Sequence, residues 1–246
     1  MAPKPSISVI IPAINEERTI RGVVETVRTW GKGSEVIAVI DEATTDGTES
    51  AVRSCGDGIK ILKNARDKGK GEAMAAGIAQ ARGDILLFVD ADLVSLTPSD
   101  LDLLVAPLIK GTYSMAIGVL RYWQAGGYEP FNDISGTRSV RRDRISGHIE
   151  KMHNKGYGIE VFFNNLIGPK EITHVRLPHV FVLTKFEKQT ATDAIITYII
   201  EARDLLTEAI NVTSSVSPRT RKMLRGVKSY LKTALEYFSV NGRHKE

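Results

Sequence analysis

Short apolar runs alternate with segments of helical spacing through the first part of the chain. The predicted strands are Ser6–Pro12, Val36–Ile40, Lys60–Leu62 and Asp84–Val89. Helical patterns at Glu16–Thr29 and Lys70–Ala81 lie between them, and Asp46 is the predicted cap of a further short helix. This alternation predicts a mostly parallel α/β sheet that helices cover, with functional loops at the carboxyl ends of its strands.

The middle of the chain adds further elements of both kinds. Pro98–Lys110 and Arg138–His153 have helical patterns, and the second of these is strongly basic. Tyr113–Val119 is a predicted strand. Ile172–Leu183 is also a predicted strand, but it is broken at Pro178 because proline cannot donate a ladder hydrogen bond.

A loop and two long helical patterns complete the predicted organisation. Residues 121–137 hold most of the local glycine, aromatic and proline content, which is typical of a loop. The helical patterns lie at about 190–211 and 218–239. We therefore expect one domain at 1–185 and a C-terminal helical extension at 186–246 that packs on the core or on a partner subunit of a homodimer.

The second of these helical patterns is both basic and amphipathic. An apolar stripe lies beside a cationic face that comprises Arg219, Arg221, Lys222, Arg225, Lys228 and Lys232. Packing on its own domain or on a partner is the favoured interpretation. Peripheral contact with an anionic membrane is the alternative, since basic amphipathic helices also bind such surfaces.

The charge and cysteine content exclude several classes of protein. Lys and Arg total 33 against 29 Asp and Glu, and a net charge of +4 is too small to predict a nucleic-acid binder. Cys55 is the single cysteine, which excludes an internal disulfide and a cysteine-based metal site. The sequence predicts neither a signal peptide nor a span of roughly 20 apolar residues. We expect a cytoplasmic protein, with the inner face of the membrane as the alternative location.

Two aspartates directly follow the most apolar predicted strand. Asp90 and Asp92 stand at positions i and i+2, so both carboxylates point the same way in an extended segment. Hard carboxylate oxygens suit Mg²⁺ or Mn²⁺, which also bind substrate phosphates. Two solvated turn residues are the alternative, but neighbouring carboxylates at the end of a buried strand repel each other without a cation. The pair therefore predicts a metal site.

Other polar residues follow the remaining strands of the predicted sheet. Asp41 ends a strand, where a carboxylate can accept hydrogen bonds from a base or a ribose. Asn15 and Glu16 follow the first strand, and both a ligand role and a role in the first helical turn stay open. The segment Lys68-Gly69-Lys70-Gly71-Glu72 precedes a helix and favours a bound phosphate, with a solvated turn as the alternative.

In combination these segments resemble the family 2 glycosyltransferases. The matching segments keep that family's order and spacing, and they are Val9–Glu17, Val39–Thr48, Lys68–Ala73 and Ala81–Leu93. The resemblance implies a GT-A fold, in which a Rossmann-like α/β sheet binds a nucleotide sugar with Mg²⁺ or Mn²⁺, and it makes residues 1–185 the catalytic domain. Glu42 and Ala43 stand where the family usually has Asp and Gly, which leaves the base preference open.

The resemblance also implies roles for individual residues. Asp92 would be the principal metal ligand, with Asp90 beside it and His179 as a candidate third ligand. A structural role for His179 beside its strand is the alternative. The residues implied to contact the nucleotide sugar are Pro12, Ala13, Asn15, Glu16, Asp41, Lys70, Asp90 and Ala91.

Weaker resemblances concern the acceptor. Ile134–Arg138, followed by Arg141 and Arg142, looks like the acceptor-side segment of polyprenyl-phosphate sugar transferases. Gly156–Val161 looks like a segment that those enzymes share with glucosyl-3-phosphoglycerate synthases. The three arginines are candidates for a clamp on an acceptor phosphate, or for a solvated basic face. Glu160 is the candidate catalytic carboxylate, and a helix-terminal charge is its alternative.

These observations lead to a hypothesis for function with two alternatives. A cation beside Asp92 would neutralise charge on a leaving diphosphate, so we expect hexosyl transfer from a UDP- or GDP-sugar. Polyprenyl phosphate is the first candidate for a phosphate-bearing acceptor, and 3-phosphoglycerate is the alternative within the same class. A non-catalytic nucleotide-sugar-binding protein is the alternative outside it. The sugar, the stereochemical outcome and the oligomeric state stay open.

Overall fold

A seven-stranded sheet forms the centre of the computed structural model, which describes residues 3–64, 69–121, 132–183 and 191–212. The strands of this sheet are β1 (Ile7–Ala13), β2 (Glu35–Asp41), β3 (Ile59–Asn64), β4 (Ile85–Phe88), β6 (Met115–Leu120), β7 (Arg138–Arg141) and β8 (Ile172–Leu177). Their order across the sheet is β3-β2-β1-β4-β7-β6-β8. Among these strands β7 alone runs antiparallel to its neighbours, so the predicted mostly parallel sheet is confirmed.

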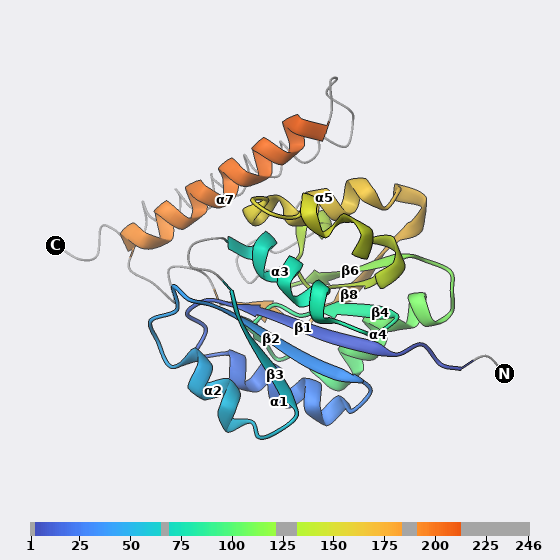
Figure 1. The fold of residues 1–246 in the computed structure, drawn as a ribbon, viewed down its shortest axis with the longest axis horizontal. Coiled ribbons are helices and arrows are strands. Elements are labelled where there is room, and N and C mark those ends of the chain that lie inside the picture. Colours follow the sequence, from blue (N-terminus) through green and yellow to red (C-terminus); the bar gives the residue numbers. More distant parts are fainter. Residues whose placement is uncertain (1–2, 65–68, 122–131, 184–190, 213–246) are drawn as a thin grey trace.

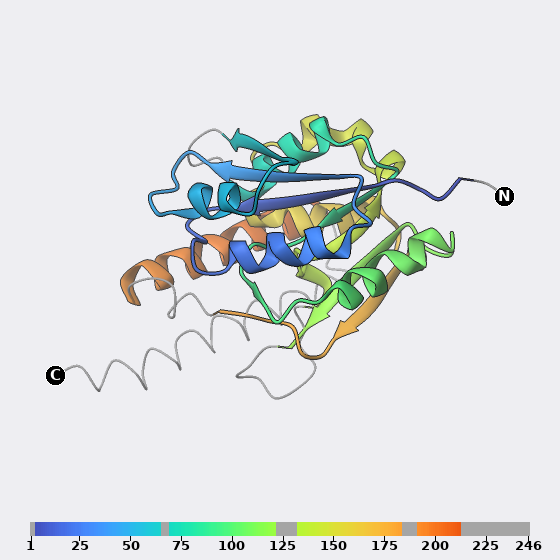
Figure 2. The same cartoon turned by 90° about the horizontal axis from the view of Figure 1, so that it is seen from below.

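Helices cover both faces of the sheet, as the two views show (Figures 1 and 2). On one face lie α1 (Ile20–Trp30), α2 (Thr48–Ser54) and α4 (Pro98–Ile109). On the other face lie α3 (Gly69–Gln80) and α5 (Ile159–Leu166). This layered α/β architecture is the predicted fold class, and it explains why the strands are apolar on both sides.

The central strand β1 shows how the sequence produces this arrangement. Its residues alternate between the two faces, so Val9 and Ile11 belong to the core under α1 while Ile10 belongs to the core under α3. All three side chains are fully buried. An uninterrupted β-branched run is therefore what a strand between two helical layers requires.

The segment after β6 differs from the sequence prediction. Arg138–His153 was a predicted helix, and this prediction is wrong because the segment begins with β7, inserted between β4 and β6. The 3₁₀ helices η2 (Arg142–Arg144) and η3 (Ser146–Lys151) follow the strand. Burial of Arg138, Ser139 and Val140 in the sheet overrides the local helical pattern.

The other predicted elements of the middle region are present. The strand broken at Pro178 forms β8 and then β9 (Phe181–Val182), which pairs with the short β5 (Leu93–Val94) in a second sheet. Most of the loop predicted at 121–137 lies outside the described residues, as does the helix predicted at 218–239.

One long helix follows the sheet along the chain. This helix, α7 (Ala191–Val212), packs on α5 and on the preceding turn η4 (Gly156–Gly158) (Figure 1). It matches the first of the two predicted C-terminal helices. The division of the chain at residue 185 stays a prediction. In the described part of the chain, no helix has the length and apolar character needed to cross a membrane.

Two helical glycines provide a matched test of the packing between α3 and β1. A Cβ at Gly77 would lie 2.5 Å from Ile10 Cγ2, whereas a Cβ at Gly22 in α1 would meet no atom within 4 Å. Alanine gains about 0.5–1 kcal/mol over glycine in a helix, but overpacking costs about 1–3 kcal/mol. We expect Gly22→Ala to raise the free energy of unfolding and Gly77→Ala to lower it, as measured by urea titration. Equal stability of the two variants would contradict this packing.

Candidate active site

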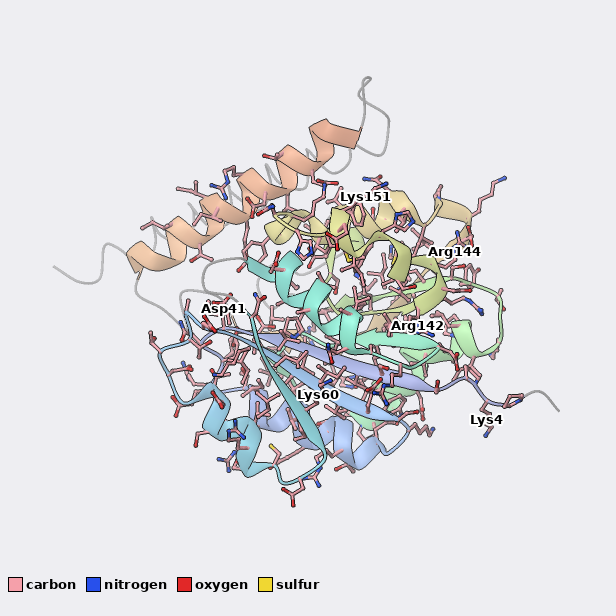
Figure 3. All side chains as sticks on the ribbon, in the orientation of Figure 1. Lys4, Asp41, Lys60, Arg142, Arg144 and Lys151 are labelled. Atoms are coloured by element: carbon pink, nitrogen blue, oxygen red, sulfur yellow. The ribbon has the colours of Figure 1, made fainter. Side chains whose placement is uncertain are left out.

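The carboxyl ends of β1, β2 and β4 meet at one edge of the sheet. Asp41 ends β2 at this edge (Figure 3), and Asp90 and Asp92 follow β4 there. The parallel pairing of β1 with both neighbours brings these ends together, because parallel strands terminate on the same side. The edge thus collects the polar residues that the sequence analysis placed after separate strands.

A buried ion cluster forms the centre of this edge. The Lys70 ammonium lies 2.8 Å from Asp90 Oδ1 and 2.8 Å from Glu160 Oε1. The side chain of Glu160 is 4% exposed, and those of Lys70 and Asp90 are each less than one fifth exposed. Three predicted site residues from α3, the β4 end and α5 are therefore in direct contact.

The electrostatic environment keeps Lys70 and Asp90 ionised. Burial opposes the charge of Lys70, but the attraction of Asp90 and Glu160 outweighs it and raises the pKa of Lys70 well above its ordinary value. Burial likewise opposes the charge of Asp90, yet the charge of Lys70 and hydrogen bonds from Lys70 and Thr137 lower the pKa of Asp90. Lys70 thus carries its positive charge between two carboxylates.

The turn before β7 closes over the cluster, and it belongs to the segment Ile134–Arg138 that resembles an acceptor-side segment; the individual contacts of Gly136 and Thr137 were not predicted. The Thr137 hydroxyl donates to Asp90 Oδ2 at 3.1 Å and accepts from the Asp90 backbone N–H at 3.3 Å. A Cβ at Gly136 would lie 2.1 Å from Lys70 Nζ and 2.3 Å from Asp90 Oδ1. Any larger residue at position 136 would displace the ends of the Lys70 and Asp90 side chains from their present positions.

Arg138 lies inside the protein. Its guanidinium donates to the Ser135 carbonyl from Nε at 2.9 Å, to Asn164 Oδ1 at 3.1 Å and to the Glu160 carbonyl at 3.3 Å. The side chain is fully buried, and burial lowers the pKa of Arg138 to about 10 against the opposing charge of Glu160. Arg138 thus ties the turn before β7 to α5.

The predicted arginine clamp on an acceptor phosphate is wrong as a three-residue unit. Strand β7 pairs Arg138 with Phe88 near the carboxyl end of β4, and Arg141 with Ile85 near its amino end. Arg142 donates from Nε to the Gly83 carbonyl at 2.9 Å, which is also at the amino end, and Figure 3 shows it on the side opposite Asp41. An antiparallel strand necessarily carries its two ends to opposite edges of the sheet.

The residues predicted to contact the nucleotide lie around the ends of β1 and β2. Pro12 and Ala13 are the last residues of β1, and they pair with β2 near Asp41. The Asp41 carboxylate accepts the Ala43 N–H at 2.8 Å. Asn15 adopts a positive φ of 53°, and its Oδ1 accepts the Thr45 N–H at 2.8 Å. The loops after β1 and β2 are thus bonded to each other.

Glu16 contributes to the same connection between the loops. Its backbone N–H donates to Thr48 Oγ1 at 2.8 Å, which ties the loop after β1 to the start of α2. Helix α1 begins at Ile20 and has no acidic residue in its first turn, so the first-turn alternative for Glu16 is wrong. A ligand role for the Glu16 side chain stays a prediction.

The proposed metal ligands are not all brought together. Asp92 is partly exposed after β4, and Ala91 beside it is buried. His179 Nε2 instead lies 3.0 Å from Asp100 Oδ2 at the start of α4. Among the described residues, no group of three or more His, Cys, Asp or Glu side chains could hold a metal ion. The third-ligand prediction for His179 therefore lacks geometric support, whereas the oxygens of Asp90 and Asp92 suit a cation completed by water and substrate phosphate.

Two buried hydroxyl groups lack hydrogen-bond partners within the described part of the chain. These are Thr44 Oγ1, three residues after the end of β2, and Ser135 Oγ, in the turn before β7. Buried polar atoms are normally satisfied, so each hydroxyl has room for a partner outside the described residues, such as water, a ligand or another part of the chain. Both belong to segments that end at the same edge of the sheet as Asp90.

The ion cluster can be tested by neutralising its cation. Lys70→Met leaves Asp90 and Glu160 without a counter-charge, so we expect the free energy of unfolding to fall by about 3 kcal/mol. Adding Glu160→Gln should restore part of this loss. The control is Lys32→Met, which breaks an exposed pair with Asp102 (2.6 Å) and should cost less than about 1 kcal/mol. Equal losses in urea titrations of the two single variants would contradict the buried cluster.

Known proteins are similar to a part of this chain. Glucosyl-3-phosphoglycerate synthase from Mycobacterium tuberculosis (strain ATCC 25618 / H37Rv) is 34% identical over 114 residues, which are 43% of this chain and 35% of that protein. Undecaprenyl-phosphate 4-deoxy-4-formamido-L-arabinose transferase from Salmonella paratyphi B (strain ATCC BAA-1250 / SPB7) is 30% identical over 118 residues, 45% of this chain and 36% of that protein. The matches thus span about a third of the length of these relatives.

Solved structures are similar in fold over most of this chain. A crystal structure of the Mycobacterium tuberculosis glucosyl-3-phosphoglycerate synthase, in complex with Mn²⁺, UDP-glucose and phosphoglyceric acid, has a TM-score of 0.64 and 22% identity. The match covers 86% of this chain and 82% of that one. The model of the family named Glycosyl transferase family 2 matches residues 8–168, from β1 through α5 and including the whole ion cluster. The chain belongs to glycosyl transferase family 2.

Proposed function

We propose that this protein is a metal-dependent glycosyltransferase that moves a hexosyl group from a nucleoside-diphosphate sugar to a phosphate-bearing acceptor. One observation carries the proposal: Lys70 bonds both Asp90 of the Asp-x-Asp motif and Glu160 at the sheet edge. The bridge links the side where a donor diphosphate would bind to the side where an acceptor would bind. Membership of the family supports the same assignment.

The donor side follows from the loops after β1 and β2. Asp41 and the unpartnered hydroxyl of Thr44 offer acceptors and a donor to a base or a ribose. Asp92, with Asp90, would hold Mg²⁺ or Mn²⁺ through carboxylate oxygens. The ion, when bound, neutralises charge on the leaving diphosphate. The positive charge of Lys70 lies beside Asp90 and favours a phosphate ligand at this edge of the sheet.

The acceptor side follows from Glu160 and the turn before β7. Glu160 is held in one orientation by its bond to Lys70, so its carboxylate can accept a hydrogen bond from an acceptor hydroxyl and take its proton. The unpartnered hydroxyl of Ser135 lies in the turn that closes on the cluster. The buried bonds of Arg138 fix this turn and hold Glu160's helix in place.

Two phosphate-bearing compounds are candidates for the acceptor. The sequence segment Ile134–Arg138 favours polyprenyl phosphate. The relatives and solved structures favour 3-phosphoglycerate, because the Mycobacterium tuberculosis protein is named for that acceptor. We therefore place 3-phosphoglycerate first for this chain, with UDP-glucose as donor. Polyprenyl phosphate is the second candidate, because the Salmonella paratyphi B relative is named for such a lipid.

Asp92→Ala tests the metal assignment. Loss of a ligand that supplies several kcal/mol of charge stabilisation should lower transfer at least about 100-fold with Mn²⁺ present. Binding of UDP-glucose and Mn²⁺, measured by calorimetry, should weaken in parallel while the unfolding transition stays unchanged. The matched control is Asp57→Ala, an exposed aspartate before β3. Transfer by Asp92→Ala at the rate of Asp57→Ala would remove the metal assignment.

A comparison of acceptors tests the proposed reaction itself. UDP- and GDP-sugars with Mn²⁺ or Mg²⁺ would be incubated with 3-phosphoglycerate, or with polyprenyl phosphate in detergent and in liposomes. We expect glycosylated 3-phosphoglycerate as the product. A product with polyprenyl phosphate alone would reassign the acceptor. Binding of the donor without turnover on either acceptor would instead favour the non-catalytic alternative.

A further inference from the structure

Helix α7 contacts the turn that carries Glu160 into the site. Asp204 Oδ2 accepts the Tyr157 backbone N–H at 3.2 Å, within η4. Gly156 has a positive φ of 50°, and a Cβ there would lie 2.1 Å from Asp204 Oδ2. The Asp204 side chain is 14% exposed, so the carboxylate lies between α7 and the turn.

A second ion pair and a small apolar cluster fix the same contact. Lys155 Nζ lies 2.6 Å from Glu208 Oε2, and the Glu208 side chain is 5% exposed. Val161 of α5 packs against Ala202 and Leu205 of α7 in a buried cluster. Helix α7 thus makes polar contacts with the residues before Glu160 and an apolar contact with the residue after it.

The other side of the turn packs on the helix that carries Lys70. A Cβ at Gly71 would lie 3.0 Å from the Met152 carbonyl and 3.2 Å from the Gly156 N. A Cβ at Gly69 would lie 3.4 Å from the Gly156 Cα. The glycines that flank Lys70 therefore let α3 approach the turn closely, and the turn lies between α3 and α7.

These contacts connect α7 with the ion cluster through one short segment. Gly156 and Gly158 make the turn conformationally permissive, so its own backbone does not fix where α5, and with it Glu160, lies. We propose that Asp204 is a positioning residue, which holds the 156–158 turn against α3 so that Glu160 meets Lys70. This inference rests on the proposed function and extends it to a helix outside residues 8–168, the part that the family model matches.

The test compares three variants of the full chain. Asp204→Ala removes the acceptor for the Tyr157 N–H, and Asp204→Asn keeps an acceptor oxygen in the same place. The control is Thr207→Ala on the same helix, whose exposed side chain bonds the Arg203 carbonyl within α7. Rates of sugar transfer, thermal unfolding and backbone hydrogen exchange of residues 156–164 would be measured for each.

We expect Asp204→Ala to lower kcat about tenfold with little change in KM for the donor, because small displacements of a reacting group are costly. Hydrogen exchange at 156–164 should speed up in Asp204→Ala, and exchange in β1 and β4 should not. Asp204→Asn should recover most of both losses, and Thr207→Ala should match the wild type.

Two results would overturn the inference. One is wild-type hydrogen exchange at 156–164 in Asp204→Ala. The other is a fall in kcat that Asp204→Asn does not recover. If the wild-type protein transfers no sugar to any acceptor, the proposed function fails, and hydrogen exchange alone then decides whether Asp204 holds the turn.

Discussion

The bridge from Lys70 to Asp90 and Glu160 is the interaction on which the site depends. Each partner comes from a different part of the chain, so the bridge forms only when α3, the β4 end and α5 are all in place. A buried carboxylate pair without a cation would be strongly unfavourable. The cluster therefore forms only after these distant segments have come together, and in the proposed function it would set the spacing between the donor and acceptor sides.

Glycine residues are as important for this packing as the charged groups. Gly136 leaves room for the turn before β7 to lie on the ion pair, and Gly71 lets α3 approach the turn before α5. Gly77 does the same between α3 and β1. In each case an added Cβ would crowd a neighbouring group, so glycine allows a close approach, and α3 packs on its neighbours through two such contacts.

Arginine 138 illustrates how a buried charge can serve structure at an active site. Its guanidinium satisfies the Ser135 and Glu160 carbonyls and the Asn164 side chain, all out of contact with solvent. Burial of a charge is costly, and the bonds offset that cost only because the fork of donors finds acceptors on two elements. The same bonds orient the start of β7 relative to α5, so that Thr137 reaches Asp90.

The alternating apolar pattern by itself determined the sheet, its parallel strands and the edge where Asp41 and Asp90 lie, since these depend on local periodicity and on chain order. Only the tertiary structure decided that Arg138–Arg141 is a strand, that His179 bonds Asp100, and that Lys70 meets Glu160. These outcomes depend on which segments far apart in the chain become neighbours. Side-chain burial there outweighs local propensity, and a single sequence carries no direct record of such contacts.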